Sequence, residues 1–130
     1  MKYLLDTHTF IWMMISPQKL SEKVIYILQN ESEVYASPIV LWEISIKYGL
    51  GKIELNNTTP EELWRGAEKM GIVILPLNAD DAASFYKLEK IHKDPFDRML
   101  VWQSLKNDLI LLSKDNRLKE YEKSGLQLIW

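Results

Sequence analysis

Residues 33–47 read EVYASPIVLWEISIK, a short apolar run followed at once by the start of a helix. The first four residues of this stretch predict a buried strand. Ser37 is a typical N-cap residue, and Pro38 suits the first helical position. We therefore expect a helix from this point that ends at Gly49 or Gly51. A strand that leads directly into a helix is the building unit of α/β proteins with parallel sheets.

The same alternation of strand and helix recurs along the chain. Short apolar runs predict further strands at residues 2–5, 72–75, 109–112 and 126–129. Capping residues predict further helices that begin after Ser21, Thr59, Asn78 and Asp94. The helix after Asn78 is expected to run as far as Leu88. No repeat, linker or low-complexity tract divides the chain, so residues 1–130 are expected to form one α/β domain with a central parallel sheet.

Composition excludes several classes of protein. The chain has 130 residues, 47% of them hydrophobic, which is enough to bury about two-thirds of the unfolded surface without disulfides. It has no Cys, which excludes disulfide scaffolds, zinc ribbons and Cys nucleophiles. Its 16 Lys and Arg against 18 Asp and Glu give a formal net charge of -2. A phosphate-bearing partner therefore has to be met by a local basic surface.

The N-terminal residues form two short apolar runs that residues 6–9 interrupt. A secretory signal needs roughly 7–15 uninterrupted apolar residues and a membrane span about 20, and neither run is long enough. We therefore expect a soluble, cytoplasmic protein without a membrane segment.

Four acidic residues follow predicted strands or lie near predicted helix starts. They are Asp6, directly after the first strand; Glu43, in the second turn of its helix; Asp97, in the first turn of its helix; and Asp115, shortly after the run at 109–112. The carboxyl ends of parallel strands meet at one edge of a sheet, which is where open α/β folds bind ligands. The four acids are therefore expected to gather there.

Each acid also has a purely structural interpretation. Asp97 lies three residues after Asp94 and suits a capping box, and Asp115 suits an ordinary N-cap. Glu43 has Lys47 four residues on, and such a pair contributes about 0.3–0.5 kcal/mol if it is exposed. These alternatives stay open at the level of the sequence.

A divalent cation would explain why several carboxylates come together. Like charges at close range raise one another's pKa, and a cation removes that conflict. Oxygen ligands without Cys or a His cluster favour the hard ions Mg²⁺ and Mn²⁺. Such a site activates water for in-line attack on a phosphodiester.

The sequence resembles the PIN-domain ribonucleases, specifically the VapC-like toxins of type II toxin–antitoxin modules. Three blocks carry the resemblance: LLDTH at 4–8 with Trp12; SPIVLWEI at 37–44 with Lys47 and Gly51-Lys52; and HKDPFDRML at 92–100 with Gln103, followed by LLSKD at 111–115. The resemblance implies a three-layer α/β/α domain and Mg²⁺-dependent endonucleolytic cleavage of RNA. It also implies a cognate antitoxin that occupies the acidic groove, and a homodimer.

The resemblance also implies roles for individual residues. Asp6, Glu43, Asp97 and Asp115 fall on the four acids of the family. Asp6 and Asp97 are expected to bind the metal directly, and Glu43 and Asp115 to complete the pocket through metal or water.

Supporting roles are assigned to nearby residues. Thr7 is expected to orient Asp6, Asp94 to cap its helix, and Arg98 to position phosphate. The two histidines, His8 and His92, have two interpretations, as general acids or RNA contacts and as structural residues, of which the structural role is the more common near helix starts.

Two other functions compete with a toxin nuclease. A receiver-like signalling module also places acids and Mg²⁺ at strand ends, but it needs an acid pair near the first strand, where Asp6 stands alone. The second alternative is a catalytically inactive PIN-fold module that only binds nucleic acid or protein.

Overall fold

A single parallel sheet organises the computed structural model, which describes residues 1–31 and 33–130. The strand order is β3-β2-β1-β4-β5. The strands are β1 Tyr3–Leu5, β2 Val34–Ala36, β3 Val73–Ile74, β4 Ile110–Leu112 and β5 Gln127–Ile129. In the register, Leu4 lies opposite Tyr35 and Leu5 opposite Leu112. Because β1 is central and all pairs are parallel, the carboxyl ends of β1, β2 and β4 share one edge.

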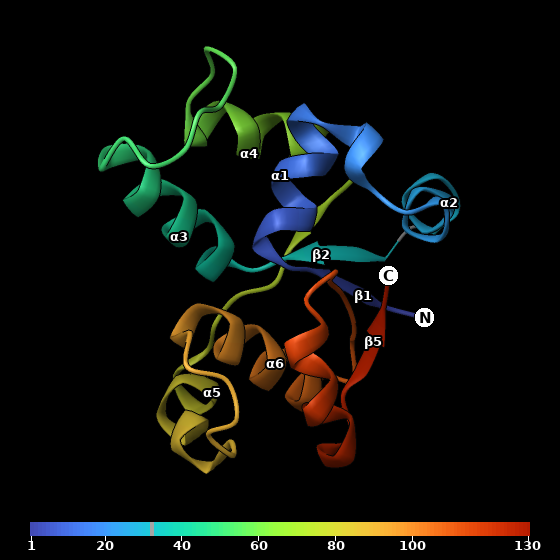
Figure 1. The fold of residues 1–130 in the computed structure, drawn as a ribbon, viewed down its shortest axis with the longest axis vertical. Coiled ribbons are helices and arrows are strands. Elements are labelled where there is room, and N and C mark those ends of the chain that lie inside the picture. The colour runs from blue at the N-terminus through green and yellow to red at the C-terminus, as the bar shows by residue number, and fades with distance from the viewer. Residues whose placement is uncertain (32) are drawn as a thin grey trace.

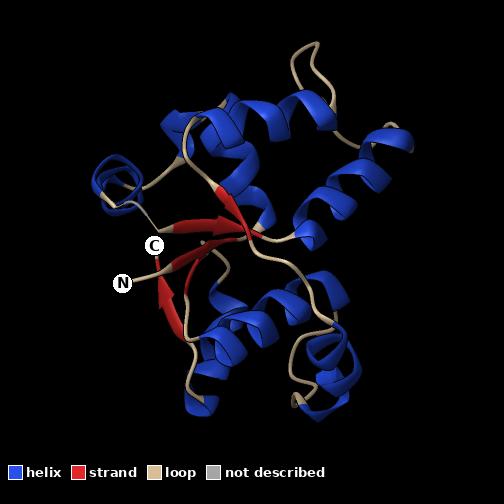
Figure 2. Cartoon of the chain, turned by 180° about the vertical axis from the view of Figure 1, so that it is seen from behind, coloured by secondary structure: helices blue, strands red, loops and turns tan. Residues whose placement is uncertain are grey.

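Helices cover both faces of this sheet. They are α1 Thr7–Ile15, α2 Glu22–Asn30, α3 Pro38–Gly49, α4 Pro60–Lys69, α5 Ala79–Ser84 and α6 Pro95–Asn107. Short 3-10 segments lie at Pro17–Lys19, Phe85–Lys87 and Asn116–Ser124. Helices α1, α3 and α4 lie on one side of the sheet and α5 and α6 on the other (Figure 1), and the view from behind shows the same three layers (Figure 2). The expected α/β/α architecture is confirmed.

The predicted helix starts are confirmed by their capping bonds. The Ser21, Ser37, Thr59, Asn78 and Asp94 side chains each accept from a backbone N–H in the first turn of the following helix. The helix after Asn78 is shorter than expected, because α5 ends at Ser84 and a 3-10 turn continues to Lys87. The Ser84 hydroxyl donates to the Asp80 carbonyl oxygen at 2.7 Å, a contact that competes with regular helical bonding.

Two segments that the sequence did not predict are helical. Helix α1 follows β1 directly, with Asp6 as its N-cap, and a 3-10 helix follows Asp115 in the same way. Two of the four acids therefore cap the elements that come after their strands. This geometry holds both carboxylates at the edge of the sheet. Within the described residues, every helix falls short of the length and apolar character that crossing a membrane requires.

Candidate active site

One cavity at the carboxyl edge of the sheet is lined by the four acids that the sequence singled out. They are Asp6 after β1, Glu43 in α3, Asp97 in α6 and Asp115 after β4. The cavity has a volume of about 410 Å³, and its other lining residues are Thr7, His8, Trp12, Lys47, Asp94, Lys114, Asn116 and Arg117. The fold thus brings these four acids together from segments that are far apart in the sequence.

Asp6 is held rigidly by the helix that it caps. Its Oδ1 accepts from the Thr9 backbone N–H at 2.9 Å and from the Thr9 hydroxyl at 2.6 Å. Burial raises the pKa of Asp6, and the Thr9 bonds oppose that rise. The expectation that Thr7 orients Asp6 is wrong: an N-cap carboxylate turns toward the third helical residue, so Thr9 fills that role.

Glu43 is buried and has two partners. The Thr7 hydroxyl donates to its Oε1 at 2.6 Å, and the Lys47 Nζ lies 2.6 Å from its Oε2. The bond to Glu43 raises the pKa of Lys47. The helical pair with Lys47, left open by the sequence, therefore exists, and it exists inside the cavity. A buried polar side chain is stabilised by such hydrogen-bonding partners.

Asp115 is fixed by an arginine two residues on. Arg117 donates to Asp115 Oδ1 through its backbone N–H at 2.9 Å and its Nε at 3.0 Å, and to Oδ2 through Nη2 at 2.9 Å. These bonds lower the pKa of Asp115 to about 2. Asp115 is therefore a permanent carboxylate whose orientation is set by the start of the following 3-10 helix.

Asp97 carries the strongest electrostatic conflict in the cavity. Burial, followed by the charges of Asp94, Asp6, Glu43 and Asp115, raises the pKa of Asp97 to about 7. The neighbouring cations offset only part of this negative charge. A further positive charge in the cavity would stabilise the ionised form of Asp97.

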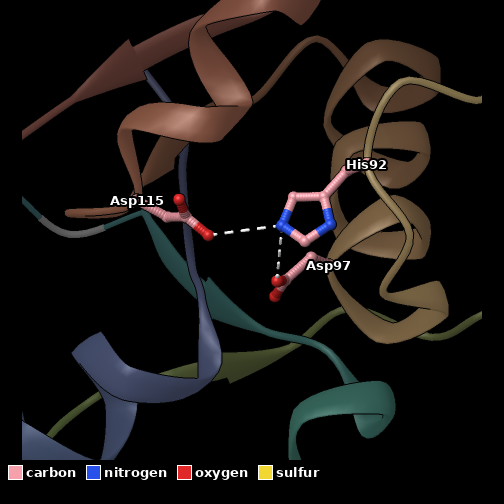
Figure 3. A group of neighbouring side chains, drawn as sticks. All are labelled: His92, Asp97 and Asp115. Atoms are coloured by element: carbon pink, nitrogen blue, oxygen red, sulfur yellow. Dashed lines mark hydrogen bonds and ion pairs between the residues drawn. The ribbon is translucent and has the colours of Figure 1, made fainter.

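His92 lies between Asp97 and Asp115 and contacts both, as Figure 3 shows. Its Nε2 lies 3.4 Å from Asp97 Oδ2 and 3.3 Å from Asp115 Oδ2. The Asp94 backbone N–H donates to His92 Nδ1 at 3.0 Å, so the neutral ring carries its proton on Nε2. His92 therefore donates a hydrogen bond to Asp115 and holds the same N–H close to Asp97.

The loop that carries His92 is held in place by the side chain of Tyr121. The buried Tyr121 hydroxyl accepts from the backbone N–H groups of Ile91 and His92 and donates to the Glu89 carbonyl oxygen at 3.0 Å. The position of His92 is thus set by packing that lies outside the cavity.

Of the other two supporting residues expected from the sequence, Asp94 lies at the cavity and Arg98 does not. Asp94 accepts from the Phe96 backbone N–H at 2.8 Å, which confirms its role as a cap, and it also lines the cavity. Arg98 lies elsewhere: its Nη2 donates to the Leu88 carbonyl oxygen at 3.2 Å, and its guanidinium sits over the Phe85 ring. The structure does not bring Arg98 to the four acids, because its side chain contacts the 3-10 segment Phe85–Lys87 and the residue that follows it.

Sequence reasoning did not identify several residues in and beside this cavity. A structural role was favoured for His92, although its place five residues before Asp97 was a usable signal. Lys114 and Arg117 were not singled out either. Both line the cavity, since Lys114 follows β4 and Arg117 lies at the start of the 3-10 helix Asn116–Ser124.

The donor set of the cavity fits a hard divalent cation. Carboxylate oxygens dominate it, and burial together with the charges of the surrounding carboxylates raises the pKa of Asp97. A ligand atom of His92 lies within 4.8 Å of ligand atoms of Asp97 and Asp115. Because the His92 proton sits on Nε2, however, the carboxylates are better suited than the imidazole to hold the cation.

Metal binding is expected to depend on pH through Asp97. A pKa of about 7 means that Asp97 holds a proton below neutrality, which a cation has to displace. The apparent affinity for Mg²⁺ should fall about tenfold for each pH unit below this pKa and level off above it. Calorimetric titrations at about pH 6 and pH 8 test this. Equal affinities at the two pH values would contradict it.

The fold and the cavity together define a class: a parallel α/β/α protein with an acidic site at the carboxyl edge of its sheet. The chain belongs to the PIN domain family, whose model matches residues 3–124. Members of this family are nucleases, so the resemblance noted from the sequence is confirmed for the family and for the nuclease class. No curated protein matches the chain.

Solved structures agree with this fold. A DNA-bound VapBC from Salmonella typhimurium is 22% identical with a TM-score of 0.67, and 99% of this chain and 97% of that chain are covered. VapBC2 from Rickettsia felis, bound to a promoter DNA fragment, is 17% identical with a TM-score of 0.70 over 99% and 98%. VapBC-1 from nontypeable Haemophilus influenzae is 23% identical with a TM-score of 0.62 over 99% and 97%. At these identities the likeness shows a shared fold.

Proposed function

We propose that this protein is a Mg²⁺-dependent endoribonuclease and the toxin of a type II toxin–antitoxin module. The observation that carries the proposal is the convergence of Asp6, Glu43, Asp97 and Asp115 in one cavity of a PIN domain. Acidic sites of this kind hydrolyse phosphodiesters with a divalent cation. The whole of residues 1–130 acts as one domain in this proposal.

The roles of the residues follow from their contacts. Asp6 and Asp97 hold Mg²⁺ or Mn²⁺, which supplies charge neutralisation and a polarised water when bound. Thr9 keeps Asp6 aimed into the cavity, and Arg117 does the same for Asp115. Glu43, with Thr7 and Lys47 as partners, is placed to orient water.

The partners follow from the same proposal. The similar solved structures are toxin–antitoxin complexes, which supports a cognate antitoxin that covers the acidic cavity until it is released. We also infer a homodimer, from the resemblance, and a cytoplasmic location, where the RNA substrate is found.

The test is cleavage of RNA by the purified protein. Cleavage is expected with Mg²⁺ or Mn²⁺ and is expected to stop when EDTA removes the metal. The genetic test is a small adjacent open reading frame whose product neutralises growth inhibition by this chain. Binding of RNA without any cleavage would instead favour the inactive binding module.

A further inference from the structure

A second cavity of about 270 Å³ adjoins the acidic one. The two cavities share Thr7, His8, Trp12 and Lys47 as lining residues. The second cavity lies between α1, α3 and the segment that follows α3. The second cavity therefore lies directly beside the acidic one, with these shared side chains at the junction.

Trp12 stands at the junction of the two cavities, and its ring is fixed by aromatic neighbours. The edge of its indole meets Trp130 at a centroid distance of 5.7 Å. The His8 ring stacks on it at 5.6 Å with an interplanar angle of 28°. The His8 side chain itself is exposed. The stack thus offers a flat aromatic surface at the junction.

Two lysines are held beside this ring, one toward each cavity. The Lys19 Nζ lies 6.0 Å and the Lys114 Nζ 5.9 Å from the centroid of the Trp12 ring. Lys114 lines the acidic cavity, and Lys19 lines the second one. Both side chains are exposed, and among the described residues neither makes an ion pair. The arrangement is a cation–aromatic cluster that spans the junction.

We propose that the second cavity is a nucleotide subsite for single-stranded RNA, next to the phosphodiester that is cleaved. Lys19 and Lys114 contact phosphates on the two sides of the junction, and a base stacks on the aromatic surface of His8 and Trp12. This inference rests on the proposed nuclease function. Cationic grooves with aromatic side chains are the usual means of binding a single strand without regard to its sequence.

An RNA strand is favoured over a protein segment because the subsite adjoins the cavity that holds the acids. A strand whose phosphate lies at the carboxylates has to leave the cavity on both sides. Where it leaves through the second cavity, it meets cations and an aromatic surface. These are the groups that its phosphates and bases bind.

Binding should be measured first, in an Asp97→Asn background that prevents cleavage. The probe is a fluorescent single-stranded RNA of roughly 10 nucleotides, with Mg²⁺ present. Lys19→Ala and Lys114→Ala should each weaken binding about 3–10-fold at low salt. Each should also reduce the slope of log affinity against log salt by about 0.7, as expected for one lost phosphate contact on a single strand.

Lys106→Ala is the matched control. The Lys106 Nζ lies 5.6 Å from the Trp102 ring centroid, so it forms a pair of the same kind on α6, outside both cavities. Its removal should change neither the affinity nor the salt slope. If Lys106→Ala lowers RNA affinity as much as Lys19→Ala does, the affinity depends only on the overall charge of the protein, and the proposed subsite is wrong.

Cleavage supplies the second readout, in a chain that keeps Asp97. Lys19→Ala should raise KM and leave kcat unchanged, since Lys19 lies in the second cavity. The difference in KM between Lys19→Ala and the native chain should disappear when the RNA is shortened at the end that occupies the second cavity. It should persist when the RNA is shortened at the other end. If trimming from either end leaves the difference unchanged, the subsite is wrong.

The remaining outcomes separate this inference from the proposed function. If the variants keep full RNA affinity but lose affinity for the antitoxin, the second cavity is a protein-docking site and the inference fails. If RNA affinity falls as expected but the native chain cleaves no RNA, the subsite stands and the nuclease proposal fails.

Discussion

Asp97→Asn should lower RNA cleavage by roughly 10³-fold and, at the same time, raise the thermal stability of the metal-free protein. Asn keeps the size of the side chain but carries no charge, so it is a poor metal ligand. It also removes the group whose ionisation the cavity opposes most strongly. The same substitution is therefore expected to act in opposite directions on activity and on stability.

The sign of the stability effect follows from the pKa. In the folded protein burial and neighbouring carboxylates raise the pKa of Asp97 from 3.8 to about 7. The contribution of protonated Asp97 to the free energy of unfolding is fully present below pH 3.8 and is lost as the pH rises toward 7. At about pH 8 the ionised side chain costs about 2–4 kcal/mol, allowing for its partial exposure. Its removal should raise Tm by at least about 5 °C.

Asp108→Asn is the matched control, because Asp108 is an exposed residue at the end of the same helix. Its left-handed backbone is one that Asn also tolerates. Differential scanning calorimetry with and without Mg²⁺ measures both variants. An unchanged Tm for metal-free Asp97→Asn, or full cleavage by that variant, would refute the assignment of Asp97.

His92→Asn should lower cleavage by about 10–100-fold, a typical effect of removing a partner that orients metal ligands. Asn at this position still presents an acceptor near Nδ1 for the Asp94 N–H, but no donor reaches the two carboxylates. The loop should therefore keep its conformation while Asp115 loses its hydrogen bond from His92 and Asp97 loses the neighbouring N–H.

His92→Gln is the complementary variant. Its amide N–H reaches close to the place of Nε2, but it leaves the Asp94 N–H without the Nδ1 acceptor. If His92 acts by orienting the carboxylates, the Gln variant should cleave faster than the Asn variant while being less stable. A purely structural role predicts the reverse order of activity, with activity following Tm. Mg²⁺ affinity measured by calorimetry should follow the order of activity.

The acidic balance of the chain has a local explanation. The formal charge of 16 minus 18 is -2, and four of those acids, Asp6, Glu43, Asp97 and Asp115, form the proposed metal site. Setting these four aside leaves 16 minus 14, or +2. The two cations proposed to contact RNA lie at this cavity and the adjoining one, as Lys114 and Lys19. Net charge is therefore a poor guide to the substrate here.

Much of the fold was predictable because strands and helix starts depend on near neighbours in the sequence. A cap such as Ser37 or Asp94 bonds to a backbone N–H two residues on, so the signal and its partner lie within one turn. Helix α1 was missed for the opposite reason. Its residues 7–15 are largely β-branched, aromatic or apolar, with little polar face to mark a helix. Packing of its apolar side chains into the core, such as that of the buried Phe10, stabilises α1 instead.

The sequence also identified the four acids, because each follows a strand or opens a helix and parallel strands end at one edge of the sheet. Their partners could not be found in this way. Thr7 bonds to Glu43 across 36 positions, and His92 reaches Asp115 across 23. Such contacts depend on which helices pack together, and no local pattern encodes that. Local sequence thus determined the elements and the acids, whereas packing between distant segments determined how those acids are held, charged and approached.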